Sequence, residues 1–412
     1  MIDMENVKSI SGSHNNYNFN KSILMHKNIP VASVELTKRK GSIIAVTGVF
    51  NIKHAPLTTF NEKDGKIDPL KLDDWLEGRS IPASRQNVTK LMRDLNITSP
   101  TALALQSYGL SLSDHYWIKP VNQDILWEDI NFFQNEFSDD IGKILMDEKN
   151  SNDPNIDVRS PDNSSDGMLR KRWTIQNQKR VLIKGADTKY QLQQEPFNEV
   201  IASQIMAKLN INRTPYTQLF IDDKPYSLCE AFTNENIEYI TAYSVLKHFK
   251  RDVKLSEYEQ ILDNCQKLGI GDMRHKIEQM LVLDYLIANT DRHLGNFGFL
   301  RNADTLEYEG FAPIFDSGTS LWCDGSIVSN RTESKPFKKN HNSQIKLVTD
   351  LSWYDPIPKN QLTDIIIHNL SKNEPIKDVR VGISEERITK IAETVNQRSE
   401  FIANLKKELS SK

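Results

Sequence analysis

The pattern of apolar and polar positions along the chain predicts a mixed α+β protein. Short apolar or alternating runs are typical of strands, and longer runs with three- and four-residue spacing are typical of helices. Strands are expected at residues 22–36, 43–50, 169–175, 180–184, 217–221 and 226–230. Helices are expected near residues 70–76, 84–94, 99–107, 196–209 and 385–409, the third with Ser99 as N-cap and Pro100 at its first position.

The segment before residue 291 has a different character, because its apolar residues occupy nearly all sides of the predicted helix. Positions 280–288 contain a single acid, Asp284, and no Gly or Pro. Such a helix is expected to be buried on most faces. It leads into the polar loop Asp291-Arg-His-Leu-Gly-Asn296, so a rigid core element would position the side chains of this loop.

The spacing within the loop indicates phosphoryl-transfer chemistry. Asp291 and Asn296 are five positions apart, as are the Asp and Asn of the protein-kinase catalytic loop H-R-D-x-x-x-x-N. There the Asp accepts the proton of the attacking hydroxyl and the Asn binds magnesium. Asp316 follows after a predicted hairpin and an apolar strand at 311–315, which would return it to the loop. Asn296 and Asp316 are therefore predicted to hold one Mg²⁺.

Lys184, at the end of an apolar strand, matches the kinase lysine that contacts the nucleotide phosphates. Considered alone, it could equally be a surface lysine whose stem packs on apolar neighbours. An acid on the following helix is the expected ion-pair partner, and both Glu195 and Glu199 are available.

The motifs Asp-Arg-His-x-x-Asn and Ala-Pro-x-x-Asp-x-Gly together resemble the HipA family of bacterial Ser/Thr kinases, the toxins of type II toxin–antitoxin pairs. This resemblance implies an α+β, two-lobed protein-kinase-like fold behind a small N-terminal α+β domain. The predicted parts are a flexible segment (1–21), the N-terminal accessory domain (22–150), the kinase N-lobe (151–240) and the helical C-lobe (241–412). The polar stretch 149–167 marks the clearest boundary.

The resemblance also assigns further site residues. The family carries an Asn-Glu pair on the helix after the lysine strand, which selects Glu199 as the partner of Lys184. Gly167 would belong to the loop over the phosphates, although this loop has a single glycine where the family is richer in small residues. Glu230 and Phe232 would form the hinge against adenine, and His293 would line the nucleotide pocket or brace the loop. Ser164 and Ser165 lie where HipA-like kinases autophosphorylate, in a stretch predicted to be too polar to pack.

The resulting hypothesis is transfer of the ATP γ-phosphoryl group to a protein Ser or Thr, with Mg²⁺ as cofactor. The resemblance implies a translation component, such as an aminoacyl-tRNA synthetase, as substrate, and an antitoxin partner encoded nearby. A phosphoinositide-kinase-like lipid kinase, a metal-dependent hydrolase and a non-catalytic kinase-fold binding protein remain alternatives. The absence of an Asp-Phe-Gly motif disfavours the lipid kinase, and the presence of Asp291, Asn296 and Asp316 disfavours the silent module.

Composition and charge limit the number of domains, the class of ligand and the cellular location that we expect. The chain of 412 residues can hold two or three domains, and its net charge of −3 argues against a general nucleic-acid binder. The helices around residue 97 could be read as a helix-turn-helix, but the second lacks basic residues for phosphates, so no direct DNA binding is expected. Three cysteines without metal-ligand spacing, and neither a signal peptide nor a membrane-length apolar run, predict a cytoplasmic protein. The basic segment 331–346 occupies the place of an activation segment, as a substrate contact or a solvated loop.

Overall fold

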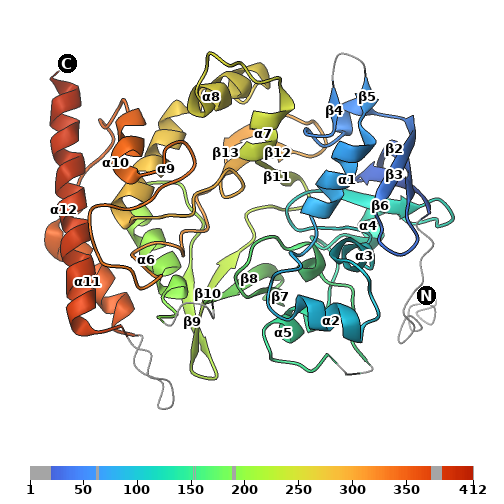
Figure 1. Cartoon of the computed structure of the whole chain (residues 1–412), viewed down its shortest axis with the longest axis horizontal. Helices are drawn as coiled ribbons and strands as arrows, with labels where there is room; N and C mark the ends of the chain where they lie inside the picture. Colours follow the sequence, from blue (N-terminus) through green and yellow to red (C-terminus); the bar gives the residue numbers. More distant parts are fainter. Residues whose placement is uncertain are drawn as a thin grey trace. The chain divides into compact units, whose positions relative to one another are not determined.

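The computed structural model describes residues 20–61, 65–151, 153, 155–187, 192–372 and 383–411 (Figure 1). Contacts divide the chain into two compact units. The first takes in the chain up to Leu182 together with Thr233–Glu238 and Ala303–Leu306, and the second takes in Ile183–Phe232, Tyr239–Asn302 and the chain from Glu307. Of the segment predicted to be flexible, residues 1–19 lie outside the described part of the chain. The predicted domain boundaries stay predictions.

The first unit contains short strands and short helices. Its elements are β1 (Lys21–His26), β2 (Ile29–Leu36), β3 (Ile43–Val49), β4 (Phe60–Asn61), β5 (Lys66–Ile67), α1 (Pro69–Gly78), α2 (Val88–Asp94), α3 (Pro100–Leu105), β6 (Tyr116–Pro120), α4 (Trp127–Ile130), α5 (Asp140–Leu145), the 3-10 turn Pro161–Ser164 and β7 (Lys171–Gln176). Strands β8 (Lys179–Gly185) and β11 (Ile237–Thr241) begin in this unit and end in the other.

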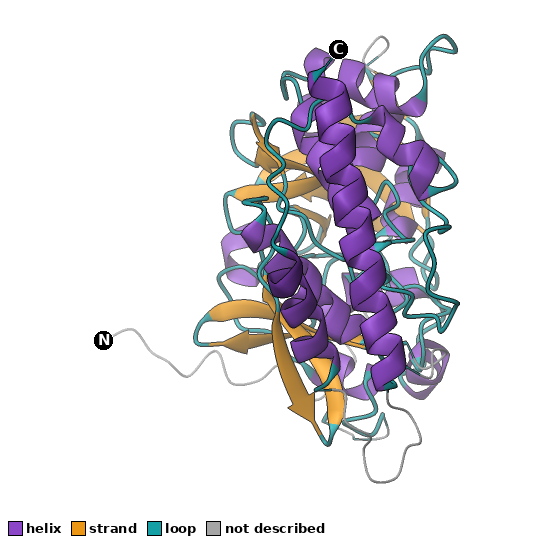
Figure 2. Ribbon diagram, turned by 90° about the vertical axis from the view of Figure 1, so that its left-hand side faces the viewer, coloured by secondary structure: helices purple, strands orange, loops and turns teal. Residues whose placement is uncertain are grey.

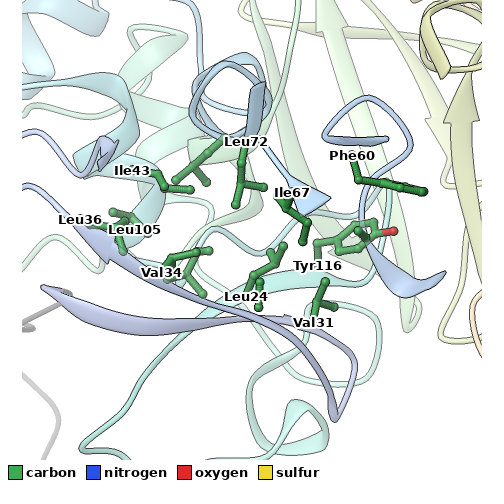
Figure 3. Packing of buried hydrophobic residues seen from close by; sticks show 14 residues of the cluster. Leu24, Val31, Val34, Leu36, Ile43, Phe60, Ile67, Leu72, Leu105 and Tyr116 are labelled. Carbon is green, nitrogen blue, oxygen red and sulfur yellow. The ribbon is translucent and has the colours of Figure 1, made fainter. Parts of the chain in front are cut away.

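The core of the first unit is an antiparallel sheet in the order β3-β2-β1-β6, apolar on both faces. Because side chains alternate along a strand, neighbours on β1 point to opposite faces. Leu24 joins a cluster with Leu72 of α1, whereas Met25 joins a second cluster with Trp117. Figure 3 shows the first cluster, in which residues of β1, β2 and β3 meet Leu72 of α1 and Leu105 of α3.

Among the described residues, the second unit carries four strands beside β8 and β11, and most of the longer helices. Its elements are α6 (Glu195–Lys208), β9 (Thr217–Ile221), β10 (Lys224–Glu230), α7 (Ala242–His248), α8 (Glu257–Lys267), α9 (Arg274–Ile287), β12 (Gly298–Asn302), β13 (Tyr308–Phe311), α10 (His341–Gln344), α11 (Lys359–Leu370) and α12 (Glu385–Ser410). Strand β10 lies between β8 and β9, and β12 lies between β11 and β13.

Local sequence explains where helix α8 begins. Ser256 and Glu259 form a capping box at α8, in which each side chain accepts from the other residue's backbone N–H.

The long helix α12, which reaches the C-terminal end of the chain in Figure 2, packs along α9 and α11. Helix α9 is the predicted apolar helix, and all its residues from Ile277 to Ile287 are buried. No helix in the described ranges is long and apolar enough to cross a membrane.

Four local predictions were wrong. The strand expected at 22–36 is two antiparallel strands, β1 and β2, because the chain turns at Lys27, which has a left-handed φ of 47°. The helix expected at 84–94 begins at Val88, because Asn87 has a left-handed φ of 66° that no helix can include. The strand expected at 311–315 stops at Phe311, since Pro313 has no N–H for a sheet ladder. Ile314 instead makes an isolated bridge with Arg213. The last wrong prediction concerns residues 160–165, which are packed and are described together with the candidate site below.

Candidate active site

The centre of the candidate site is the ammonium group of Lys184, which contacts two carboxylates at once. Lys184 stands near the end of β8, Glu199 on the second turn of α6, and Asp316 in the loop after β13. The Lys184 Nζ donates to Glu199 Oε1 and to Asp316 Oδ1. The ion pair between Lys184 and Glu199 that the sequence predicted is therefore present, and Asp316 joins it.

In the group formed by Lys184, Glu199 and Asp316, burial and neighbouring charges have opposite effects on the pKa of Lys184. Burial of Lys184 would lower its pKa, but the charges of Asp316 and Glu199 outweigh burial and raise the pKa, so the amine is a cation. Burial raises the pKa of Glu199, Lys184 opposes that rise, and the charge of Asp316 adds to it. The single lysine thus allows two acids to stand close together in a buried site.

Glu195, the other candidate partner of Lys184, faces a different environment. Its Oε1 accepts from the backbone N–H of Asp187 at 3.2 Å, and its Oε2 has no hydrogen-bond partner among the described residues. Burial raises the pKa of Glu195 to about 7. Since Glu199 also accepts from the Ser317 N–H at 2.9 Å, the two acids on one helix differ sharply in their surroundings.

The loop 291–296 is braced from within. The Asn296 Nδ2 donates to the backbone oxygen of Asp291 at 3.0 Å, and the Asn296 N–H donates to the His293 oxygen at 2.9 Å. The His293 Nδ1 accepts from the Gly295 N–H at 3.1 Å, so His293 braces the loop, and its place in the nucleotide pocket stays a prediction. Because the amide nitrogen of Asn296 is used inside the loop, its oxygen Oδ1 is the atom suited to a cation.

Arg292 links this loop to Asp316, a function that the sequence analysis did not assign. Its fully buried guanidinium pairs with Asp284 of α9, with Nε 3.0 Å from Oδ2. It also donates to the Asn296 oxygen at 2.9 Å, to the Phe315 oxygen and to Ser317 Oγ at 3.0 Å. The available signal was Asp284 itself, because an acid within an otherwise apolar helix needs a buried partner.

Aromatic residues surround Phe232, one of the two predicted hinge residues. The rings of Phe232, Tyr239 and Phe315 lie with centroids 5.3–5.6 Å apart. The Tyr239 hydroxyl donates to the Gly295 oxygen at 3.0 Å, so this cluster also contacts the loop. Glu230, the other hinge residue, ends β10. Sequence reasoning missed Tyr239 and Phe315, because nothing local indicates that residues so far apart in the chain meet.

Tyr216 is another buried neighbour that was not predicted. Its hydroxyl oxygen accepts from the Asp316 N–H at 3.4 Å, and the Lys184 Nζ lies 5.7 Å from the centre of its ring. Asp316 itself has a left-handed φ of 55°. Residues 212–214, which form backbone hydrogen bonds with Ile314 of 3.0 and 3.1 Å, hold the chain just before this turn.

Lys335, in the basic segment 331–346, contacts the proposed base. Its Nζ lies 2.7 Å from Asp291 Oδ1, and both side chains are about half exposed. The segment therefore reaches the loop 291–296, and its function as an activation segment stays a prediction.

Gly167, Ser164 and Ser165 belong to the first unit, so their place relative to this site stays a prediction. The expectation that their stretch is too polar to pack was wrong. Both serines are buried, and Ser164 Oγ donates to the Leu110 oxygen at 2.5 Å. Arg85 is also buried and donates to the oxygens of Ser165 and Gly167, so polar partners replace apolar contacts.

Comparison with known proteins relates the chain to HipA-type proteins. Residues 154–400 match the model of the HipA-like C-terminal domain. A stretch of 132 residues is 30% identical to the serine/threonine-protein kinase CtkA of Helicobacter pylori, and covers 31% of this chain and 40% of that protein. A solved structure of CtkA, described as a proinflammatory kinase, covers 58% of this chain and 95% of its own at 21% identity, with a TM-score of 0.44.

A second solved structure extends the comparison to nearly the whole chain. HipA of Shewanella oneidensis MR-1, solved with HipB and operator DNA, covers 95% of this chain and 99% of its own at 11% identity, with a TM-score of 0.56. The fold is thus the HipA-type kinase fold, and the predicted α+β class is confirmed. Since the domain model matches more than half of the residues, the chain belongs to the family of proteins with a HipA-like C-terminal domain.

Proposed function

We propose that this protein is an ATP- and Mg²⁺-dependent serine/threonine protein kinase of the HipA type. The observation that carries the proposal is the contact of Lys184 with both Glu199 and Asp316. A kinase needs this lysine, its helix partner and the metal-binding acid in one place. A metal-dependent hydrolase has no use for a lysine held between two acids in this way.

The donor set fits magnesium. Asn296 Oδ1 and the carboxylate of Asp316 are oxygen ligands, the type that Mg²⁺ prefers. An ion held by Asn296 and Asp316 would neutralise negative charge that develops on the phosphates during transfer.

The residues of the chain would act as follows. Lys184 would bind phosphate oxygens and Glu199 would hold Lys184 in place. Asp291 would accept the proton of a Ser or Thr hydroxyl as its oxygen forms a bond to the γ-phosphorus. The bond from that phosphorus to the bridging oxygen of ATP breaks, and ADP leaves. Arg292 keeps the two loops that carry Asp291 and Asp316 in register.

Substrate and biological setting form the second part of the proposal. We propose a translation component, such as an aminoacyl-tRNA synthetase, as the substrate, and an antitoxin protein encoded nearby as the partner. Support comes from family membership and from the Shewanella structure, in which HipA of a toxin–antitoxin system was solved together with HipB. Ser164 or Ser165 would be the site of autophosphorylation.

Radiolabelled ATP and Mg²⁺ test the activity directly. Purified protein is incubated with cell lysate, and label is followed in protein bands, in phosphoamino acids and in a chloroform extract. We expect phosphoserine or phosphothreonine in protein with wild type, and none with Asp316→Ala. Label in the lipid extract alone would favour a lipid kinase. No incorporation by a folded protein that binds Mg-ATP would favour a non-catalytic module.

A further inference from the structure

Outside the candidate active site, the first unit contains a fully buried group of two histidines and a glutamate. His26 ends β1, His115 directly precedes β6, and Glu238 lies on β11, within the segment Thr233–Glu238 of the same unit. The Glu238 Oε2 lies 3.1 Å from His26 Nε2 and 3.6 Å from His115 Nδ1. All three potential ligand atoms lie within 4.8 Å of one another, and all three side chains have no exposed surface.

The hydrogen bonds of His115 determine where its proton lies. The His115 Nε2 is 2.9 Å from the backbone oxygen of Asn234, which can only accept, so Nε2 carries a proton. In neutral His115 the other nitrogen, Nδ1, then has a bare lone pair. Within the described chain this Nδ1 has no hydrogen-bond partner, yet it faces the carboxylate of Glu238.

Two electron-rich atoms that face each other in a fully buried site are unfavourable unless a cation lies between them. That cation is either a second proton on His115 or a metal ion. The surroundings of His26 favour the metal. Its Nδ1 lies 2.8 Å from His54 Nδ1, so one of the two nitrogens must donate to the other. If His26 donates, its Nε2 lone pair also faces Glu238.

This arrangement is the one that metal-binding histidines show. Such a histidine usually donates its second ring N–H to an outer partner, which fixes the tautomer and orients the ligand nitrogen. His54 and the Asn234 oxygen would be these outer partners for His26 and His115. Zinc bound tetrahedrally at about 2.0–2.2 Å places its ligand atoms roughly 3.3–3.6 Å apart. The two distances to Glu238, 3.1 and 3.6 Å, lie close to that separation.

We propose that His26 Nε2, His115 Nδ1 and the carboxylate of Glu238 bind a divalent transition-metal ion, zinc by its donor set. Two imidazoles and one carboxylate are a ligand set that zinc takes in proteins, with a fourth position for a small ligand such as water. The proposed ion lies apart from Asn296 and Asp316 in chemistry, since those offer only oxygen atoms. This proposal does not depend on the kinase activity.

The ion would have a structural function. It would join the end of β1 and the start of β6 to Thr233–Glu238, the segment that directly follows Phe232. Because the ligands come from distant parts of the sequence, binding would be coupled to folding of the first unit. The proposed ion would thus hold in place the segment Thr233–Glu238, which directly follows the predicted hinge residue Phe232.

The test measures metal rather than activity. Full-length protein without a histidine tag is stripped with chelator, dialysed against Zn²⁺ or Co²⁺ and then against metal-free buffer. We expect one zinc per chain by elemental analysis, and the visible absorption bands of tetrahedral Co²⁺. Glu238→Gln and His26→Gln keep similar shapes and polar atoms but should lose the metal. Loss of the outer partner in His54→Phe should weaken zinc affinity about 10- to 100-fold.

His341→Gln is the matched control, since His341 is buried but belongs to the other unit. It should retain full metal content. Circular dichroism of each variant separates loss of metal from loss of fold, and the wild-type measurement stands by itself if a variant fails to fold. No zinc retained by wild type, or a sulfur-to-cobalt charge-transfer band that reveals cysteine ligation, would overturn the proposal. Equal zinc binding by wild type and both ligand variants would do the same.

Discussion

The guanidinium of Arg292 and the carboxylate of Asp284 form a fully buried ion pair, in which Nε lies 3.0 Å from Oδ2. Asp284 belongs to the buried helix α9, whereas Arg292 reaches the backbone of both loops of the candidate site. The charge of Asp284 more than offsets the effect of burial and raises the pKa of Arg292, which stays protonated. The ion pair therefore holds the two loops that carry Asp291 and Asp316 in a fixed position relative to helix α9.

Asp284→Asn should lower the free energy of unfolding by about 3–5 kcal/mol, because it leaves the guanidinium buried without its counter-charge. Urea denaturation followed by tryptophan fluorescence measures the loss. The control is Arg251→Gln, which removes an ion pair of 3.7 Å between half-exposed side chains and should cost about 1 kcal/mol or less. Equal losses of unfolding free energy in the two variants would show that the buried pair contributes no more to stability than the exposed pair.

Asp291→Asn should reduce phosphoryl transfer about 10²- to 10⁴-fold, because it removes the proton acceptor. The affinity for Mg-ATP should change little, since the proposed phosphate and metal contacts come from other residues. Single-turnover transfer and calorimetric titration with a non-hydrolysable ATP analogue separate the two quantities. Retained activity would exclude Asp291 as the base.

Lys184→Met should lose stabilisation by nucleotide. Wild type should gain about 2.7 kcal/mol when Mg-ATP is present at about 100 times its Kd. The variant should gain much less, as read from thermal unfolding with and without ligand. Lys224→Met, which changes an exposed lysine at the first position of β10, serves as control and should behave as wild type. The same gain in both variants would place Lys184 outside the nucleotide site.

Glu195 should make stability depend on pH. Its pKa in the folded protein is about 7, raised by burial from an ordinary value of 4.5. Between these values the folded state holds the proton and the unfolded state does not. The contribution of Glu195 is therefore fully present below pH 4.5 and lost as pH rises through 7, at most about 3 kcal/mol. Glu195→Gln should abolish this decline in urea titrations at pH 5 and 8. An unchanged pH dependence in the variant would contradict the assignment.

Arg85 should control access to the proposed autophosphorylation site. Since Arg85 holds the oxygens of Ser165 and Gly167, and Ser164 is bonded to the Leu110 oxygen, the segment must leave its packed position before either serine is modified. Arg85→Ala should therefore accelerate phosphorylation of Ser164 or Ser165, read by mass spectrometry after incubation with Mg-ATP. The modified form should be inactive, because about two added negative charges would repel ATP phosphates. If neither serine is modified in active Arg85→Ala protein, the autophosphorylation proposal fails.

The sequence by itself determined the elements whose signals are local. The spacing of Asp291 and Asn296, the strand that ends near Lys184 and the N-cap at Ser99 all depend on residues close together in the chain. Helix α6, from Glu195 to Lys208, was predicted to within a residue at each end. Periodicity and capping are properties of neighbouring residues, so such predictions need no knowledge of what lies across the core.

Only the tertiary structure decided which residues meet across distance. Glu195 and Glu199 both lie on α6, and local sequence left both open as partners of Lys184 until the family resemblance selected Glu199. The structure shows that Glu199 contacts Lys184, whereas Glu195 accepts from the Asp187 N–H. The polar residues around Ser164 pack because Arg85 and Leu110 supply partners from elsewhere in the first unit. His26, His115 and Glu238 carry no local motif at all. Burial and hydrogen bonding across long sequence separations assemble these groups, and local sequence holds no record of such pairings.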